Sequence, residues 1–282
     1  MVRLYPRPDS AELRRFYPPE EPAPAHLAIQ NWWMRLLRRC LLGDHARFAR
    51  RALDEVPGTH PVLDVNCGTG LFLRALNLPQ NRLVGLDFSV GMASIAWAHN
   101  AVPAACGALS SAPFPAGTFA LITMFQVLEH LYDPSVYIQA ASQLLCPDGR
   151  LIVQVPNASS WQFLLLGEHW SGLDIPRHLL LFREVDLRNL LDFFGFEVIR
   201  KKRFSLRDDP ALLVKSLAPG VSPDVRRWRR SDENRVAALL KNALFGLFWL
   251  FALPIAALES ACRGGATLTL EARLKRVPAD PS

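Results

Sequence analysis

The sequence predicts an α/β fold in which a parallel sheet carries helices on both faces. Half of the 282 residues are hydrophobic and 21% are charged, a composition that excludes intrinsic disorder. From residue 61 onward, short apolar runs alternate with helical patterns, and a glycine-rich turn follows the first run. That alternation is typical of parallel strands joined by helices.

Each element of the core follows from its own local pattern. Buried strands are short apolar runs, and helices carry apolar residues at three- and four-residue spacing. We predict strands at 62–65, 83–87, 119–125 and 151–155, helices at 71–76, 92–99 and 136–145, and a turn at Cys146-Pro-Asp-Gly.

The order changes after Pro156. Residues 185–194 predict a helix that ends at Gly195, and 196–204 and 264–274 alternate like strands. About 60 residues separate these strands, far more than a hairpin needs, so 205–264 is predicted to be an insertion with its own helices.

The amino-terminal part predicts an extended arm followed by a helix. Residues 1–25 are rich in proline, whereas 25–56 are helical in pattern, with Trp32 and Trp33 beside arginines. This helix caps the core or presents a basic face to a membrane. The predicted domains are therefore 1–54 (arm and cap), 55–204 (core), 205–264 (insertion) and 265–282 (last strand and tail).

Charge and cysteine content narrow the classes of protein. The five cysteines form no C-x-x-C pair, which excludes a disulfide framework and a structural zinc site. No secretory signal is visible, so we expect a cytoplasmic protein, with the inner face of the membrane left open. The net charge is +6, but no nucleic-acid motif accompanies the basic clusters at 200–203 and 226–230, and no nucleic-acid partner is expected.

The glycine turn and a following acid predict an adenosine-containing ligand. Val62-Leu-Asp-Val-Asn-Cys-Gly-Thr-Gly70 is a strand, a tight turn and a helix start, and Asp87 ends the next strand. An acid there suits ribose hydroxyls. The turn lacks the lysine of a phosphate loop, and Asp64 would repel a pyrophosphate. It suits an ammonium group, such as that of S-adenosylmethionine (SAM).

Five ordered motifs resemble the class I, Rossmann-like SAM-dependent methyltransferases. VLDVNCGTG is similar to their first motif, and GLDFS carries their ribose-binding acid. APFPAGTFALI, QVLEHLYDP and PDGRLIVQVPN are similar to their later segments. The resemblance covers 60–204 and extends to 265–274. Within the class, Ile175-Pro-Arg-His-Leu-Leu-Leu-Phe182 points to the ubiquinone-biosynthesis-type and related bacterial enzymes.

The resemblance implies a doubly wound, seven-stranded, mostly parallel sheet whose last strand is antiparallel, and SAM as the cofactor. It places Asp64, Asn66, Cys67, Gly68 and Gly70 around the methionine part, Asp87 at the ribose, Phe88, Met92, Leu109 and Ser110 near the adenine, and Phe125 and Gln126 by the sulfonium.

Three residues depart from the family pattern. Asn66 replaces the first glycine of the turn, although asparagine tolerates a positive φ better than most residues. Ala108 and Ala120 stand where the family often has aspartate. These two alanines support the alternative of a binding protein that kept the fold without the cofactor.

Methyl transfer from a sulfonium needs alignment, and a base only where the acceptor must lose a proton. The candidates are Glu129, His130 and His178; for His130, a structural role in hydrogen bonding is the alternative. Related proteins hold a divalent ion in this region, but Gln126 lacks the charge that such an ion favours, and we predict no metal.

Residues 243–258 contain no charge, and Lys241 and the arginines of 226–230 precede them. As a helix the segment would extend ~24 Å, short of the ~30 Å hydrocarbon core. It is a buried helix or lid, an interfacial segment, or a span. We predict methyl transfer to an apolar, lipid-like or lipid-linked acceptor, on oxygen in preference to carbon, with membrane contact through 226–258. A soluble small-molecule enzyme with a lid and a non-catalytic protein are the alternatives; an RNA methyltransferase comes third.

Overall fold

The computed structural model describes residues 1–16, 32–228, 234–262 and 264–275. The chain divides into two compact units. The insertion unit comprises Met1–Pro19, Val155–Glu184 and Lys202–Leu268, and the core unit comprises Glu20–Gln154, Val185–Lys201 and Thr269–Ser282. The predicted insertion at 205–264 lies within the first of these, whereas part of the predicted arm at 1–25 lies outside the described residues.

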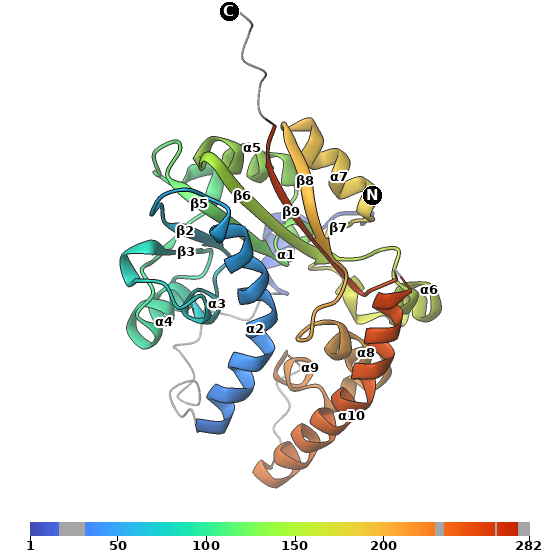
Figure 1. Ribbon diagram of the computed structural model, residues 1–282. Coiled ribbons are helices and arrows are strands. Elements are labelled where there is room, and N and C mark those ends of the chain that lie inside the picture. Colours follow the sequence, from blue (N-terminus) through green and yellow to red (C-terminus); the bar gives the residue numbers. More distant parts are fainter. Residues whose placement is uncertain (17–31, 229–233, 263, 276–282) are drawn as a thin grey trace, which may run out of the picture. The chain divides into compact units, whose positions relative to one another are not determined.

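The sheet confirms the predicted fold class. Its seven strands run in the order β4-β3-β2-β5-β6-β9-β8 (Figure 1). They are β2 (Val62–Val65), β3 (Leu83–Asp87), β4 (Ala104–Cys106), β5 (Phe119–Phe125), β6 (Leu145–Pro156), β8 (Phe196–Lys202) and β9 (Thr267–Leu274). The pairs β2–β3, β2–β5, β3–β4 and β5–β6 are parallel.

The last strand is antiparallel to its neighbours. At one end of β9, Lys275 donates its backbone N–H to Gly195, just before β8. At the other end, a Cβ on Gly265 would lie 1.7 Å from the carbonyl oxygen of Arg203, just after β8. Opposite ends of the two strands therefore meet, as the antiparallel pairing requires.

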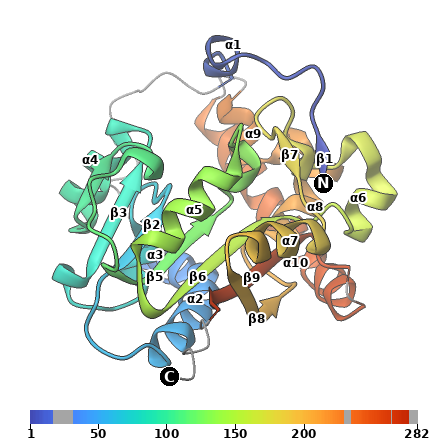
Figure 2. The ribbon, with the colours of Figure 1, turned by 90° about the horizontal axis from the view of Figure 1, so that it is seen from above.

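Helices cover both faces of the sheet in the core unit. They are α2 (Trp32–Asp54), α3 (Leu71–Ala75), α4 (Val90–Asn100), α5 (Pro134–Leu144) and α7 (Glu184–Phe193), with 3₁₀ turns η2 (Gln80–Arg82), η3 (Leu109–Ser111) and η4 (Leu128–His130). Figures 1 and 2 show α2 and α3 on one face and α5 on the other. Ser89 caps α4, and Asp133 caps α5 before a proline in its first turn, the residue types that helix starts favour.

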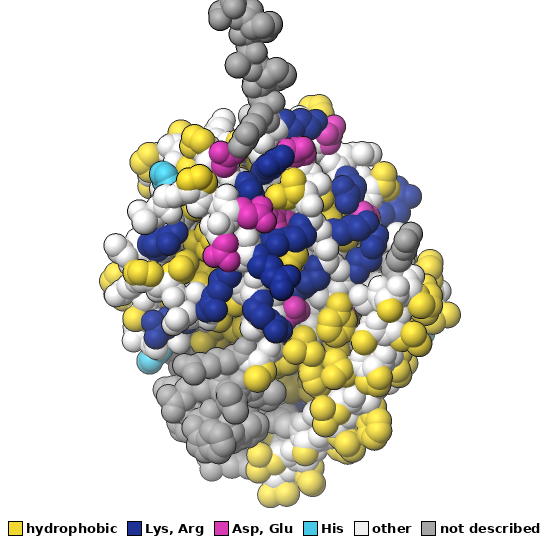
Figure 3. All heavy atoms as spheres, in the orientation of Figure 1, with side chains coloured by type: hydrophobic (Ala, Val, Ile, Leu, Met, Phe, Trp, Pro, Cys, Tyr) yellow, Lys and Arg dark blue, Asp and Glu magenta, His cyan; other side chains and the backbone are white. Residues whose placement is uncertain are grey.

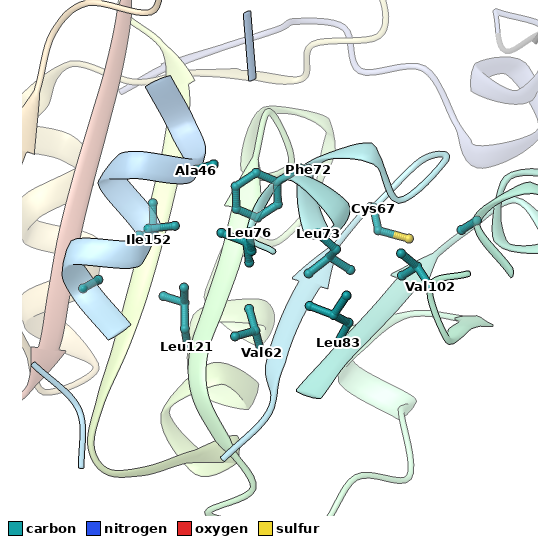
Figure 4. Packing of buried hydrophobic residues seen from close by; sticks show 13 residues of the cluster. Ala46, Val62, Cys67, Phe72, Leu73, Leu76, Leu83, Val102, Leu121 and Ile152 are labelled. Atoms are coloured by element: carbon teal, nitrogen blue, oxygen red, sulfur yellow. The ribbon is translucent and has the colours of Figure 1, made fainter. Parts of the chain in front are cut away.

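The core beneath the glycine turn is built from α2, α3, α4 and the central strands. Figure 4 shows Ala46 of α2, Phe72 and Leu73 of α3, and Val62 of β2 in one buried cluster. Small alanines on α2 allow that helix to lie close to the sheet. This packing fixes the start of α3, and with it the turn that precedes the helix.

The insertion unit is largely helical. It contains β1 (Val2–Arg3), α1 (Ser10–Arg14), α6 (Trp161–Leu166), η5 (Gly167–His169), η6 (Ser171–Leu173), β7 (Leu180–Leu181), α8 (Asp209–Leu217), η7 (Pro219–Val221), α9 (Pro223–Trp228) and α10 (Arg235–Ala261). Strands β1 and β7 form a small antiparallel pair, so the described start of the arm is held by the chain rather than extended alone.

Three details differ from the sequence predictions. Strand β4 was not predicted, because its three residues are too few for a pattern. The turn at 146–149 lies inside β6, as a register shift between the pairs Phe119–Leu145 and Leu121–Arg150. Helix α10 has 27 residues, about 40 Å, so the expectation that the apolar helix is too short for the hydrocarbon core is wrong. Pro254 lies inside it without ending it.

Candidate active site

In the glycine turn after β2, every second residue from Asn66 to Gly70 adopts a left-handed backbone conformation. The φ angles are +61° at Asn66, +52° at Gly68 and +75° at Gly70. Asn66 therefore does adopt the conformation that its replacement of glycine requires. A Cβ at Gly68 would meet no atom within 4 Å, so space lies open beside this residue. A Cβ at Gly70 would instead lie 3.0 Å from Val102 in the core.

The turn and Asp87 meet directly. The backbone N–H of Gly68 donates to Oδ2 of Asp87 at 2.7 Å, and that of Ser89 donates to Oδ1 at 2.9 Å. Asp87 is buried, and burial raises the pKa of its carboxyl group, an effect that the two backbone donors oppose. Each carboxylate oxygen keeps acceptor capacity for a further donor, such as a ribose hydroxyl.

Asp64 lies near the carboxyl end of β2. It is buried, and the hydroxyl of Thr123 on the neighbouring strand β5 donates to it at 2.6 Å. The sequence analysis did not single out Thr123. Thr123 lies opposite Asp64 on the adjacent parallel strand, and this position can be recognised only once the strand order is known. A buried carboxylate held in this way is suited to pair with an ammonium group.

The thiol of Cys67 faces the core rather than the open side of the turn (Figure 4). It lies beside Gly85 of β3, where a Cβ would come within 2.6 Å of the sulfur. Burial first, and then the charges of Asp64 and Asp87, raise the pKa of the thiol. It is therefore a neutral packing group, and only the backbone of Cys67 belongs to the surface of the turn.

The residues expected near the adenine gather around the end of β3. Phe88 and Met92 are 52% and 38% exposed, so both side chains are accessible to a ligand. The ring centroid of Phe88 lies 6.4 Å from that of Tyr137 on α5. Leu109 is buried in η3, which packs against α5, whereas Ser110 is exposed. Tyr137 was missed, because a tyrosine inside an amphipathic helix pattern is indistinguishable from a core residue.

A further residue with a left-handed backbone conformation, Gln126, directly follows β5. Gln126 has φ +56°, and its backbone N–H donates to the carbonyl oxygen of Gln154 at 2.9 Å. Among the described residues, its side-chain Nε2 is buried with no hydrogen-bond partner. A non-glycine residue in this conformation with an unpaired buried donor is typical of a ligand-binding position.

Phe125, at the end of β5, contacts two aromatic rings. Its ring contacts Phe72 of α3 and His45 of α2, with centroids 4.8 and 4.9 Å away. Nε2 of His45 lies 2.9 Å from Oε1 of Gln154 on β6. Neither residue was predicted: His45 comes from a region without a motif, and Gln154, although it lies in the segment PDGRLIVQVPN, was not given a role of its own.

The candidate bases occupy both units. Glu129 is fully buried and His130 half-buried in η4, directly after β5 in the core unit. His178 is buried in the insertion unit, where its Nδ1 lies 2.8 Å from the carbonyl oxygen of Gly172. Burial lowers the pKa of His178, so its neutral form is favoured.

These features fit SAM. The open side of Gly68 leaves room for the ligand, Asp64 matches its ammonium group, Asp87 its ribose hydroxyls, and Phe88 a flat adenine ring. All four residues lie in the core unit at the carboxyl edge of the parallel strands, where open α/β sheets bind ligands.

Comparisons with known proteins identify the family of the chain. The methyltransferase-domain family profile matches residues 20–201. A probable S-adenosylmethionine-dependent methyltransferase of Mycolicibacterium smegmatis is 27% identical over 61% of this chain and 62% of its own. The ubiquinone biosynthesis O-methyltransferase of Marinobacter nauticus is 29% identical over 36% of this chain and 46% of its own. The matched region thus spans about half the length of these curated relatives.

Solved structures share the fold. A putative sarcosine dimethylglycine methyltransferase from Galdieria sulphuraria superposes with a TM-score of 0.54 at 14% identity, covering 82% of this chain and 84% of that one. The chain therefore belongs to the methyltransferase-domain family and has the Rossmann-like fold of the SAM-dependent methyltransferases. Its cofactor is S-adenosylmethionine.

Proposed function

We propose that this methyltransferase transfers the methyl group of SAM to an oxygen atom, in preference to carbon, of an apolar, lipid-like or lipid-linked acceptor in the cytoplasm. The observation that carries the proposal is the direct meeting of the glycine turn with Asp87, which forms the nucleoside end of the site. Transfer to oxygen is supported by the curated relative that is named an O-methyltransferase. An apolar acceptor is supported by the exposed apolar side chains of α10.

The chain's own residues bind and align the reactants. SAM supplies a methyl group already activated by its positively charged sulfur, so little further activation is needed. Asp64 and Asp87 fix the two ends of the cofactor. Gln126 directly follows β5 and precedes η4. When the acceptor is a hydroxyl group, its oxygen would take the methyl group as the carbon–sulfur bond breaks and S-adenosylhomocysteine leaves, and His130 would accept the hydroxyl proton.

The first experiment measures SAM binding by calorimetry. Asp87→Asn removes the charge that strengthens hydrogen bonds to the ribose hydroxyls, and binding should weaken roughly tenfold to a hundredfold. Asp54→Asn is the matched control, since Asp54 is exposed at the end of α2 in the same unit. If the wild-type protein shows no binding heat with SAM, the chain is a non-catalytic member of the family, as Ala108 would favour.

The second experiment follows the methyl group. Cell extract is incubated with the protein and methyl-labelled SAM, then separated into lipid, nucleic-acid, polysaccharide and water-soluble fractions. Label is expected in the lipid fraction, in a bond that resists the conditions that cleave methyl esters if the acceptor is a hydroxyl group. Label in the water-soluble fraction would favour a small-molecule enzyme, and label in RNA would overturn the proposed acceptor class. His130→Ala should slow the transfer without weakening SAM binding.

A further inference from the structure

Helix α10 of the insertion unit presents a broad apolar face to solvent. The most apolar 18-residue window of Val236–Ala261 has a mean hydropathy of 1.9, and only 6% of that window is buried. Figure 3 shows hydrophobic side chains gathered along the lower right of the view, with backbone and other side chains between them. The exposed large side chains, 39–68% accessible, are Val236, Leu239, Leu240, Leu244, Leu247, Phe248, Leu250, Phe251, Ile255 and Leu258. A soluble monomer rarely leaves so large an apolar surface uncovered.

The opposite face of α10 already has a partner within its own unit. Phe245, Trp249 and Ala252 recur at helical spacing and pack against Leu213 and Val214 of α8. Both sides of the helix are apolar. The inner stripe packs against α8, whereas no described residue covers the outer half. What covers the outer half must come from outside this part of the chain.

The chemistry of the outer face favours hydrocarbon. Residues 243–258 carry no charged side chain, and their only polar side-chain group is the indole N–H of Trp249. Protein interfaces have about one hydrogen bond per 100–200 Å² and a polar rim, which this face does not offer along its centre. Hydrocarbon needs no hydrogen-bond partners, so a lipid bilayer matches the face better than a second copy of the chain or another protein.

Cations stand at the amino-terminal end of the same helix. Lys241 is on α10 itself, and the guanidinium of Arg226 on α9 donates to the side chain of Asn242. Positive charge beside an apolar helix is complementary to the anionic head groups of a membrane surface. The apolar face and its basic end therefore have the composition of an interfacial helix.

Contacts near the other end of α10 hold the helix against its own unit. Glu259 is buried and accepts hydrogen bonds from the backbone N–H and the side-chain amide of Gln162, at 3.0 and 2.9 Å. These bonds, together with the packing on α8, hold the helix along the surface of its unit. Spanning the bilayer would require α8, which carries Asp209 and Lys215, to enter the hydrocarbon or would require these contacts to break.

We propose that α10 is an in-plane membrane anchor whose outer face inserts into the interface of a bilayer containing anionic lipid. The inference depends on this helix and its flanks, not on the identity of the methyl acceptor. Its test therefore measures lipid binding without any activity readout, and it can fail while SAM binding and methyl transfer stand.

The test is co-sedimentation of the full chain with phosphatidylcholine vesicles, with and without phosphatidylglycerol. The wild-type protein should bind both, and more tightly where phosphatidylglycerol is present. Phe251→Ser/Leu258→Ser removes two exposed side chains of the face and should reduce binding at least tenfold. Phe193→Ser/Leu165→Ser is the matched control, because it changes one phenylalanine and one leucine that are also exposed but lie on α7 and α6, and its binding should equal that of the wild type. Lys241→Gln should lower binding roughly fivefold on anionic vesicles only.

Two further measurements separate the other occupants of this face. An alkaline carbonate wash should release the bound protein, because an in-plane helix does not cross the bilayer; protein that resists the wash would overturn the in-plane anchor in favour of a span. Light scattering without lipid reports self-association. A stable dimer that the Phe251→Ser/Leu258→Ser variant dissociates, combined with no vesicle binding, would show that a second copy covers the face and would overturn the proposal.

Discussion

At the scale of single residues, the glycine turn is supported from below by a contact between Gly85 and Cys67. Gly85 is in the middle of β3, where ordinary strand geometry would accept any residue. It must be glycine because a Cβ would lie 2.6 Å from the sulfur of Cys67 and 3.1 Å from Ala104. The position of the turn, and therefore of the Gly68 N–H that donates to Asp87, depends on this close approach.

Gly85→Ala should weaken SAM binding, because the new methyl group displaces Cys67 and shifts the turn away from Asp87. We expect a loss of about 1–3 kcal/mol in stability, the usual cost of overpacking a core, together with a clear rise in the Kd for SAM. Calorimetry with SAM and urea unfolding measure the two effects separately.

The rescue variant Gly85→Ala/Cys67→Ala decides the cause. Removing the sulfur makes room for the added methyl group, so SAM affinity should return toward the wild-type value. Cys67→Ala alone should bind SAM nearly as well as the wild type, since the thiol faces the core. If the double variant binds no better than Gly85→Ala, the contact with Cys67 does not position the turn.

At the scale of elements, the antiparallel strand β9 is tied to both neighbours by buried charge. Glu271 on β9 is fully buried, accepts a hydrogen bond from Nε of Arg200 on β8 at 2.6 Å, and lies 3.6 Å from Nε of Arg150 on β6. Burial raises the pKa of Glu271, and the two arginines oppose that rise. One carboxylate therefore links three adjacent strands.

Glu271→Gln should destabilise the protein by about 1–3 kcal/mol, because the buried guanidinium of Arg150 loses this negative partner and keeps only the partly exposed Glu55. Chemical denaturation at neutral pH measures the change. Glu197→Gln is the control: Glu197 pairs with Arg273 between the same two strands, β8 and β9, but both side chains are partly exposed, and the loss should stay within about 1 kcal/mol. Equal losses of stability in the two variants would show that burial does not determine how much each ion pair contributes.

A second buried acid sits where α8 meets β9 in the insertion unit. Asp209 is fully buried; its Oδ1 accepts a hydrogen bond from the hydroxyl of Thr267 at 2.6 Å, and its Oδ2 has no partner among the described residues. Burial raises the pKa of Asp209 well above that of an ordinary aspartate, and the nearby Glu259 adds to the rise. The folded protein thus binds this proton more tightly than the unfolded chain does.

Because of that difference, the contribution of Asp209 to stability should fall as pH rises from the ordinary aspartate pKa through the raised one. Asp209→Asn keeps an oxygen for Thr267 and removes the buried charge, so the variant should be more stable by about 1–3 kcal/mol at neutral pH and less dependent on pH. Unfolding curves across the acidic-to-neutral range test this. Asp192→Asn, at an exposed pair with Lys275, should leave the curve unchanged; a loss of stability in Asp209→Asn would contradict the sign.

The sequence predicts elements better than the contacts between them. Strands β2, β3 and β5 have the predicted bounds, because parallel strands buried on both faces are continuous apolar runs. Thr123 and Glu271 were not predicted to matter, because their partners are far away in sequence and are set by strand order. Tyr137 was missed because it resembles a core residue of an amphipathic helix. The length of α10 was underestimated, since the sequence analysis ended the helix at the charged residues that flank the apolar run.

At the scale of the whole molecule, the two compact units should respond differently to SAM. The cofactor-binding residues considered above all belong to the core unit, whereas α8, α9 and α10 belong to the insertion unit. A ligand raises the free energy only of those opening reactions that abolish its site. At a concentration a hundredfold above Kd, the free energy of such an opening rises by about 2.7 kcal/mol. Local openings elsewhere keep their own free energies.

Hydrogen exchange with and without saturating SAM measures this directly. Backbone amides of the turn at 66–70 and of Ser89 should exchange more slowly with SAM, because the ligand fixes the loops on both sides of Asp87. Amides of α10 should exchange at an unchanged rate in the absence of lipid. Equal protection throughout both units would show that they unfold as one cooperative body, and protection confined to α10 would place the SAM site away from Asp87. The Asp87→Asn variant supplies the comparison, since its weaker binding should give a smaller gain in protection when SAM is added at the concentration that saturates the wild type.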